Sequence, residues 1–370
     1  MRNIFRFQKE GNNTATLFCG SLPLMERGVT IGPVPKFQHL KTSASRGNFY
    51  RKVSQWGFLF WCVYIGIRFG IFVHLYRIGS TPGFSRPPSV EAFLPIGSLV
   101  GLKNLFITGV IHPVHPAGVV LLVTFFGMSL AAKKSFCSFI CPVGTLSEQL
   151  WKGGEKLFGR TWHLPAWVDI PLRSAKYLLL YFFIIILFKM PVAGILPFLN
   201  GPYWAVADVK MLDFFVHISS LAAGVILILA ALSLPMKNFW CRYLCPYGAL
   251  VGLLSLASPW KIRRNHENCT ECGSCARACP SHLPVNRKKV IRSVECTGCL
   301  TCVSNCPGDE ALAMSLPFWE NPLPAWAFPS FVLFLFALGV GWGMATGHWQ
   351  TTLTPADYRT LIPLAPLLSH

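Results

Sequence analysis

The stretches FCSFICPVGTL (residues 136–146) and FWCRYLCPYGAL (residues 239–250) end two long apolar runs with the same phrase, Cys-x3-Cys-Pro. The lysine before each phrase and the glycine and leucine after it also align at a constant offset, so the phrase is an internal repeat. Cysteines four residues apart are predicted to share one helical face, about one turn apart, and the proline is predicted to break the helix after the second cysteine.

The amino-acid composition indicates whether these cysteines belong to a water-soluble protein or to a membrane protein. Hydrophobic residues make up 52% of the 370 residues and charged residues only 13%. Several apolar runs approach the roughly 20 residues that cross a bilayer. The sequence therefore predicts an integral membrane protein.

Five apolar runs are candidate membrane spans, whereas a sixth run, Phe93–Gly109, is interrupted by Pro, Gly, Lys and Asn and is predicted to be interfacial or re-entrant. The predicted spans are Val53–Tyr76, Pro116–Ala131, Ala175–Met190, Phe214–Leu234 and Trp326–Ala345. Two spans separate the two Cys-x3-Cys-Pro copies. Because this number is even, both copies are predicted to face the same side of the membrane, as parallel repeats.

Basic residues concentrate in the segments that five alternating spans would leave on the inner side. This asymmetry follows the positive-inside rule and accounts for most of the net charge of +18. Nucleic acid is not an expected partner, since no basic face with interleaved aromatic residues occurs away from the membrane flanks. We therefore predict a multi-pass protein of the cell inner (cytoplasmic) membrane.

The most specific chemistry lies between the fourth and fifth predicted spans, in CTECGSCARACP and CTGCLTCVSNCP. Each follows the C-x2-C-x2-C-x3-C-P pattern that holds a [4Fe-4S] cubane in two-cluster ferredoxins, where the fourth thiolate of each run ligates the other cube. The predicted ligands are Cys269, Cys272, Cys275 and Cys306 for one cluster, and Cys296, Cys299, Cys302 and Cys279 for the other. Zinc sites or disulfides are the alternatives, and two complete four-cysteine repeats, eight cysteines in all, argue against both.

The repeated phrase supplies four further thiols, those of Cys137, Cys141, Cys241 and Cys245. If the two copies approach each other, these thiols converge near the inner boundary of the membrane. They would then ligate an additional metal, form redox-active dithiols or bind copper transiently. The alternative is that they pack as small hydrophobic residues, but the repeated pairing favours a redox or metal site.

Polar residues near the outer ends of the predicted spans are weaker candidates. Five histidines could ligate haem or line a quinol site, although histidines at this depth are also common as interfacial polar groups; they are His74, His112, His115, His217 and His348. Asp208 and Asp213 are candidate proton acceptors. Arg68 falls within a predicted span, where a charge usually faces the interior of the bundle and has a partner.

The combination of several spans, two C-x3-C-P motifs and a double-cubane segment resembles the NapH/NosR-type polytopic membrane iron-sulfur proteins, which are polyferredoxin-like. The resemblance covers residues 47–316. It implies an electron-transfer core that exchanges electrons with the quinone pool or a membrane redox partner. It also implies a respiratory reductase or cytochrome subunit as the further partner.

The predicted fold is an all-α polytopic membrane protein with about five transmembrane helices and an inserted small α+β ferredoxin domain of the bacterial 2x[4Fe-4S] type. We expect a flexible cytoplasmic tail at residues 1–48, a transmembrane core at 49–258, the cytoplasmic ferredoxin domain at 259–317 and a last span with an outer tail at 318–370. The expected function is electron transfer through two [4Fe-4S] clusters. The alternative is an assembly or regulatory factor that reduces a metal such as copper while a respiratory enzyme matures.

Overall fold

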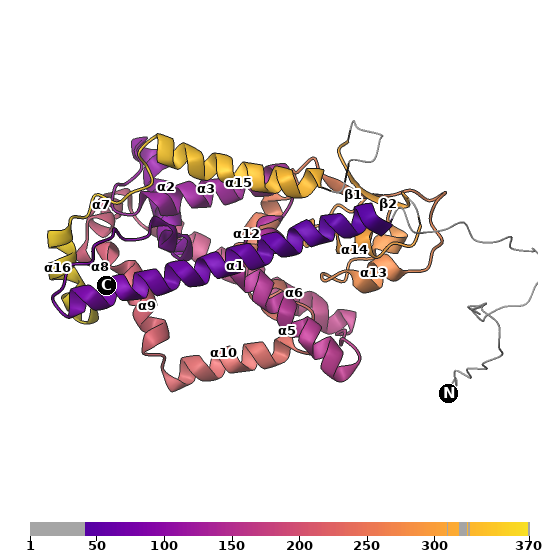
Figure 1. The fold of residues 1–370 in the computed structure, drawn as a ribbon, viewed down its shortest axis with the longest axis horizontal. Coiled ribbons are helices and arrows are strands. Elements are labelled where there is room, and N and C mark those ends of the chain that lie inside the picture. Colours follow the sequence, from indigo (N-terminus) through magenta and orange to yellow (C-terminus); the bar gives the residue numbers. More distant parts are fainter. Residues whose placement is uncertain (1–40, 309, 318–323, 325, 369–370) are drawn as a thin grey trace, which may run out of the picture. The chain divides into compact units, whose positions relative to one another are not determined.

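Helices make up most of the chain in the computed structural model, which describes residues 41–308, 310–317, 324 and 326–368 (Figure 1). Most of the predicted tail, residues 1–40, lies outside the described residues. The helices are α1 (Lys41–Arg77), η1 (Pro88–Phe93), α2 (Pro95–Thr108), α3 (Pro116–Ala132), α4 (Phe136–Phe139), α5 (Pro142–Phe158), α6 (Ala166–Lys189), α7 (Val192–Leu199), α8 (Pro202–Ala205), α9 (Ala207–Val216), α10 (Ser220–Ser233), α11 (Phe239–Tyr243), α12 (Pro246–Leu254), α13 (Ser274–Ala278), η2 (Val285–Arg287), α14 (Thr301–Ser304), α15 (Ala327–Ala345), α16 (Pro355–Leu364) and η3 (Ala365–Leu367).

Three helices in the described part of the chain are long and apolar enough to cross a membrane. They are α6, α15 and the part of α1 from Gly47 to Arg77. The number rises to four if α9 and α10, which are bent by 79°, are counted as one broken span. The apolar helix α3 has 17 residues and is shorter than these. The sequence predicts five spans, and the difference lies in α3 and in the α9–α10 pair.

The predicted span Phe214–Leu234 is not one straight helix, because the chain breaks between α9 and α10. The side-chain oxygen of Ser219 accepts a hydrogen bond from the backbone N–H of Ala222 at 3.2 Å and so caps the first turn of α10. Serine satisfies a free N–H at a helix start and therefore favours a new start over continuation. The interrupted run Phe93–Gly109 forms the short helix α2, which ends at Gly109 in the left-handed conformation (φ 74°).

The ferredoxin segment is closed by two short strands, β1 (Lys261–Arg264) and β2 (Leu312–Ser315). They pair antiparallel, with Ile262 opposite Met314. Both of these side chains are buried. The strands therefore bring the start and the end of the cysteine-rich segment together and turn apolar side chains toward it.

The apolar core of the ferredoxin segment is continuous with the core between α3 and α15. One cluster of buried residues joins Phe125 of α3, Ile262 of β1, four of the ferredoxin cysteines and Phe328 of α15. Close packing of the two helices depends on Gly339, where a Cβ atom would lie 2.2 Å from the Thr124 hydroxyl. Residues 38–370 accordingly form one compact unit.

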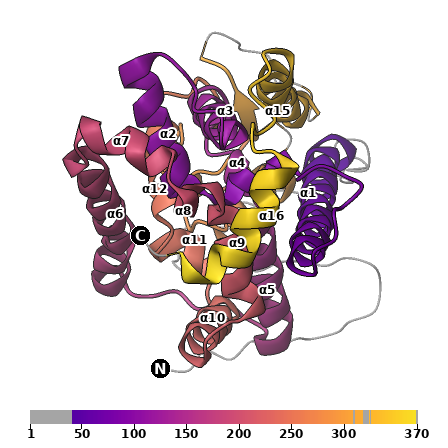
Figure 2. The same cartoon turned by 90° about the vertical axis from the view of Figure 1, so that its left-hand side faces the viewer.

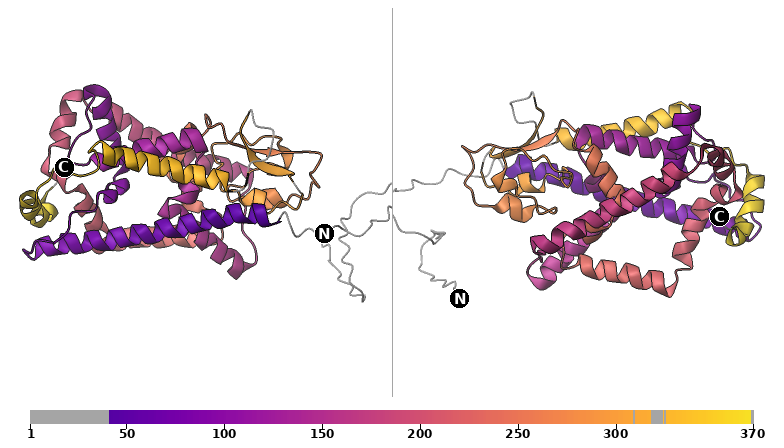
Figure 3. Two further views of the ribbon diagram at one scale, coloured as in Figure 1. Left: turned by 45° about the horizontal axis from the view of Figure 1, so that its top comes forward. Right: turned by 180° about the vertical axis from the view of Figure 1, so that it is seen from behind.

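The other end of this unit is covered by α16. Tyr358 and Ile362 of α16 pack with Phe72 and Tyr76 of α1 and with Val209 of α9. The views of Figure 1 and Figure 3 show β1, β2, α13 and α14 at one end of the helices and α16 at the opposite end. Figure 2 looks onto the end that carries α16.

Candidate functional site

Each Cys-x3-Cys pair straddles a break between two helices. Cys137 lies in α4 and Cys241 in α11, whereas Cys141 and Cys245 have extended backbones and are the N-caps of α5 and α12. The prediction that both sulfurs of a pair share one helical face, with a break after the second cysteine, is therefore wrong. The proline does not end a helix but begins the next one, because its missing N–H is no loss at a first helical position.

The two copies of the phrase make the same turn. The backbone N–H of Cys141 donates to the carbonyl of Phe136, and that of Cys245 donates to the carbonyl of Trp240, both at 3.0 Å. Glycine is required after the first turn, because a Cβ on Gly144 would lie 2.2 Å from the carbonyl oxygen of Cys137. The repeat in sequence is thus a repeat of backbone geometry.

Cys137, Cys141, Cys241 and Cys245 all line one cavity of about 640 Å³, the four-cysteine cavity. The thiols of Cys241 and Cys245 lie within electrostatic reach of each other and of the first pair. Apolar side chains from α1, α3 and α15 form most of the wall, including Phe58, Phe125 and Phe336. The fold therefore joins the two halves of the repeat around one space.

A buried lysine faces this space. Lys134 is only 3% exposed, and it lines the four-cysteine cavity together with all four thiols. Its ammonium lies 3.5 Å from the position that a Cβ would take on Gly248, and the N–H of Gly248 donates to the Cys245 sulfur at 3.2 Å. A positive charge therefore stands beside the sulfur atoms.

One set of ferredoxin cysteines surrounds a second, smaller cavity, the Cys296 cavity. Cys296, Cys299 and Cys302 line it together with Cys279, which belongs to the other motif. Apolar side chains such as Ile262 and Ile291 form the remaining wall. Burial raises the pKa of the Cys279 thiol to about 12, so a thiolate at this position needs a compensating positive group such as a metal.

The remaining ferredoxin cysteines form a third group, the Cys269 group. Cys269, Cys272 and Cys275 lie within electrostatic reach of Cys306, which belongs to the other motif. Cys272 is exposed, and a hydrogen bond from the backbone N–H of Ser274 is the main cause that lowers its pKa. The Cys269 group therefore borders solvent, whereas the Cys296 set is buried.

A bridging cavity of about 50 Å³ shares lining residues with both the four-cysteine cavity and the Cys296 cavity. Its wall includes Cys137 and Cys241 from the first and Cys299 from the second. Beside it, the hydroxyl of Ser138 donates to the carbonyl of Thr297 at 2.8 Å. Ser138 follows Cys137 and Thr297 follows Cys296, so this hydrogen bond links the two cysteine sites directly.

The donor sets fit a cluster better than a single metal ion. Within the described ranges, no three side chains of Cys, His, Asp and Glu stand close enough together to hold one metal ion. A cubane keeps its thiolates farther apart, because each thiolate binds a different iron corner. The four thiols of the repeated phrase line one cavity and four ferredoxin thiols line the other, and four thiolates are the number that a cubane takes.

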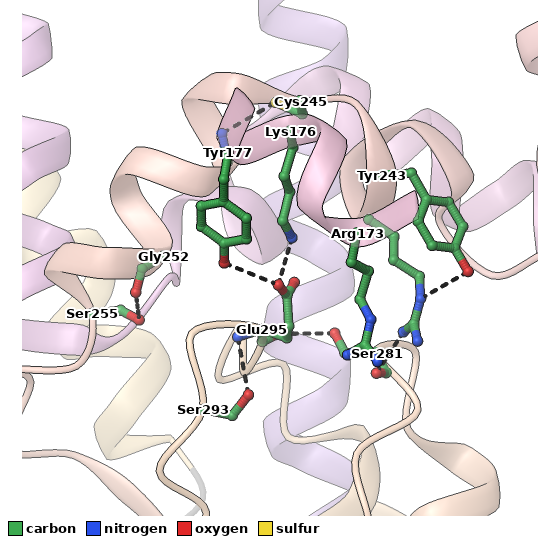
Figure 4. A network of polar contacts seen from close by, with 12 residues as sticks. Arg173, Lys176, Tyr177, Tyr243, Cys245, Gly252, Ser255, Ser281, Ser293 and Glu295 are labelled. Atoms are coloured by element: carbon green, nitrogen blue, oxygen red, sulfur yellow. Dashed lines mark hydrogen bonds and ion pairs between the residues drawn. The ribbon is translucent and has the colours of Figure 1, made fainter. Parts of the chain in front are cut away.

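Basic residues of α6 and α11 bind the ferredoxin segment and hold it against the helices. The ammonium of Lys176 in α6 lies 2.5 Å from the carboxylate of Glu295, beside the hydroxyl of Tyr177 (Figure 4). Burial alone would raise the pKa of Glu295, but the ammonium groups of Lys134 and Lys176 lower it overall. Arg242 donates to the carbonyl of Ser281 at 2.7 Å.

A second buried ionic cluster lies near α16, and its central residue, Arg86, also lines the four-cysteine cavity. The guanidinium of Arg86 contacts Asp208 at 2.5 Å and Glu91 at 2.8 Å, and it donates to Nδ1 of His115 at 3.0 Å. All four side chains are at most 2% exposed. Of the outer-end residues singled out in the sequence, Asp208 and His115 join this cluster, Asp213 pairs with Arg77 at 2.7 Å, and His112 contacts Asn200.

Four residues of these sites were not predicted from the sequence: Lys134, Ser138, Arg86 and Glu91. Lys134 adjoins the lysine that aligns in the two repeats, and its position three residues before Cys137 was the available signal. Arg68, which was noted, lines the four-cysteine cavity and places its guanidinium 4.8 Å from the centre of the Phe84 ring.

Comparison with known protein families gives the chemistry of these segments. A family described as a 4Fe-4S binding domain matches residues 114–165 and again 216–265, the two halves of the Cys-x3-Cys-Pro repeat. A family described as a 4Fe-4S dicluster domain matches residues 261–307. The fold and its sites thus define an iron-sulfur protein with membrane-type helices.

Comparison with curated relatives narrows the class of iron-sulfur protein. "Putative electron transport protein YccM" of Escherichia coli (strain K12) is 46% identical over 87% of this chain and 92% of that protein. "Ferredoxin-type protein NapH" of the same organism is 26% identical over 52% of this chain and 65% of that protein. "Regulatory protein NosR" of Pseudomonas aeruginosa is 28% identical over 49% of this chain and 25% of that protein. No solved structure matches the chain.

The chain belongs to the NapH/NosR-type, polyferredoxin-like iron-sulfur proteins, which confirms the resemblance drawn from its motifs. Its relatives and its 4Fe-4S domains support a role in iron-sulfur electron transfer.

Proposed function

We propose that the protein carries electrons between a lipid-soluble quinol or a membrane redox partner and a respiratory reductase system. The observation that carries this proposal is the row of connected cysteine sites. The four-cysteine cavity and the Cys296 cavity share walls with the bridging cavity, and the Cys269 group lies at the solvent-exposed side. A row of this kind leads from apolar surroundings to water.

Three sets of cysteines hold the cofactors in this proposal. Cys269, Cys272, Cys275 and Cys306 hold one [4Fe-4S] cluster, and Cys279, Cys296, Cys299 and Cys302 hold a second. Cys137, Cys141, Cys241 and Cys245 hold a third group, for which the matched 4Fe-4S binding domain favours iron and sulfide over copper or a dithiol pair. A [4Fe-4S] cluster supplies one-electron uptake and release.

The chain itself fixes the order and the surroundings of these sites. Ser138 and Thr297 hold the Cys137 turn against the Cys296 loop by a hydrogen bond of 2.8 Å. Lys176 and Arg242 anchor the ferredoxin segment on α6 and α11. Direct contacts of this kind favour electron transfer, because they keep the distances between the cofactor sites short without the movement of a domain.

The four-cysteine cavity is the proposed quinol site. Its wall is mostly aromatic and aliphatic, including Phe58, Trp61 and Phe336, and Arg68 is one of its few charged groups. Large apolar pockets with a few polar groups are typical of small-molecule sites. Oxidation of a quinol to a quinone breaks two O–H bonds and releases two protons and two electrons, and a cluster held by the four thiols in the cavity wall would accept the electrons.

The first test is iron content and reduction by a quinol. Anaerobically purified protein is expected to contain about 12 iron atoms per chain with matching sulfide, rather than the about 8 of a two-cluster ferredoxin. Reduced menadione is expected to produce the EPR signals of reduced clusters. Stoichiometric zinc without labile sulfide would contradict the cluster assignment, and full iron content without reduction by the quinol would leave a membrane redox partner as the donor.

We further propose that the protein lies in the inner membrane with the ferredoxin segment at the cytoplasmic side. Lys133, Lys176, Lys237 and Arg242 cluster where the helices meet this segment, in keeping with the positive-inside rule. A reporter fused after Leu316 is therefore expected to be active in the cytoplasm, and one fused after Thr352 in the periplasm. If both reporters report the same side, α15 does not cross the membrane.

A further inference from the structure

Two consecutive lysines at the end of α3 are buried beside different cysteine sites. Lys133 is 0% exposed and Lys134 is 3% exposed. Lysine is almost never fully buried unless its charge is paired, since the loss of hydration costs several kcal/mol per ion. Each of these buried ammonium groups is therefore expected to have a negatively charged group nearby.

The backbone at Lys133 is strained. Its φ of 62° and ψ of −169° lie outside the regions that a residue with a Cβ readily adopts. The N–H of Lys133 donates to the Ser258 hydroxyl at 2.9 Å, and that hydroxyl donates to the Ala131 carbonyl at 3.2 Å, which fixes this conformation. Strain held by surrounding contacts is found where a side chain must be placed for function.

Lys133 is directed to the Cys296 cavity. Its ammonium donates to the carbonyl of Ile291 at 3.3 Å, and both Ile291 and Cys296 line that cavity. The Cys296 thiol is within electrostatic reach of this ammonium, and the side chain of Lys261 lies beside both.

Lys134 lines the four-cysteine cavity together with all four thiols, and it also lines the bridging cavity. A carboxylate within its electrostatic reach is that of Glu295, but Lys176 already binds this carboxylate at 2.5 Å. Thiolates that ligate a cluster would supply the negative charge that balances Lys134.

We propose that Lys133 and Lys134 each raise the reduction potential of a different iron-sulfur site: Lys133 that of the Cys296 site and Lys134 that of the four-cysteine site. The part that concerns Lys134 rests on the proposed cluster at the four cysteines. Reduction adds an electron to a group that its thiolates already make negative. A fixed positive charge in a buried setting stabilises the reduced form more than the oxidised form, and net charge is one of the factors that set cluster potentials.

The test compares Lys133→Met and Lys134→Met in the full-length protein, by redox titration followed by EPR. Methionine keeps much of the length of lysine and removes the charge. Each variant is expected to lower the reduction potential of its own site by about 59 mV, which corresponds to a tenfold change in a one-electron equilibrium constant. The reduction potential of the other site is expected to stay unchanged. Lys133→Arg and Lys134→Arg are expected to keep the wild-type potentials.

The outcomes separate the inference from the proposed function. A wild-type protein with only two clusters refutes the third cluster and with it the role of Lys134, while the comparison at Lys133 still tests the other half. With three clusters present, unchanged potentials, or the same site shifted by both variants, overturns the inference. If Lys134→Met loses iron that Lys134→Arg retains, the charge requirement is supported, whereas equal loss in both variants overturns it.

Discussion

Cys141→Ser and Cys245→Ser are each expected to lower the rate of electron transfer on the order of 100-fold, and the double variant is expected to be no slower than either single variant. The two cysteines belong to different copies of the repeat, but they line the same four-cysteine cavity. A group that needs all its ligands is lost when one of them is removed, so the losses do not add. The measurement is quinol-dependent reduction in membranes, with the iron content and the EPR signals of the ferredoxin segment recorded separately.

Cys62 provides the matched control for iron content. It also lines the four-cysteine cavity, from α1, but it lies outside the repeated phrase. Cys62→Ser is expected to retain all the iron. Small, additive losses at Cys141 and Cys245, with the ferredoxin clusters intact, would show that these cysteines only pack in the core.

Methionine at Arg86 is expected to destabilise the protein by about 3–5 kcal/mol, the cost of leaving a buried charge without its partner. Arg86 contacts Asp208 of α9, Glu91 of η1 and His115 at the start of α3, and all of these side chains are at most 2% exposed. Its removal would leave two carboxylates in the interior with one cation fewer. Thermal unfolding in detergent, followed by circular dichroism, measures the loss.

Arg77→Met is the matched control, because Arg77 also pairs with an aspartate of α9. The Arg77–Asp213 pair is 29% and 22% exposed, and a pair of this kind contributes about 0–1 kcal/mol. The two variants are therefore expected to differ clearly in the temperature of unfolding. Equal stability of the Arg86 and Arg77 variants would mean that the buried cluster relaxes or hydrates when Arg86 is lost.

Family membership and the kind of cofactor could be predicted from the sequence because their signals are local. The spacing C-x2-C-x2-C-x3-C-P lies within twelve residues of chain, and the matches to 4Fe-4S domains cover the same segments. The apolar character of α1, α6 and α15 was likewise visible as long apolar runs with few charged residues. Neither conclusion depends on how distant parts of the chain meet.

The places where individual helices begin and end were predicted less well, because two local rules compete there. Pro142 and Pro246 were read as helix breakers, but each begins a helix, since proline suits a first helical position as well as it opposes an interior one. The run Phe214–Leu234 is apolar enough for a span, but the Ser219 cap starts a new helix within it. Hydropathy reports how apolar a run is and does not report where its backbone turns.

The sequence by itself determined that this is an iron-sulfur protein with membrane-type helices, because composition and cysteine spacing act over short stretches of chain. Only the tertiary structure decided which thiols share a cavity, that Ser138 links one cysteine site to the next, and that Lys133 and Lys134 diverge to different sites. It also decided that Arg86 binds Asp208, 122 residues away. Buried charges are placed by the elements that pack around them, and no short stretch of chain contains those elements.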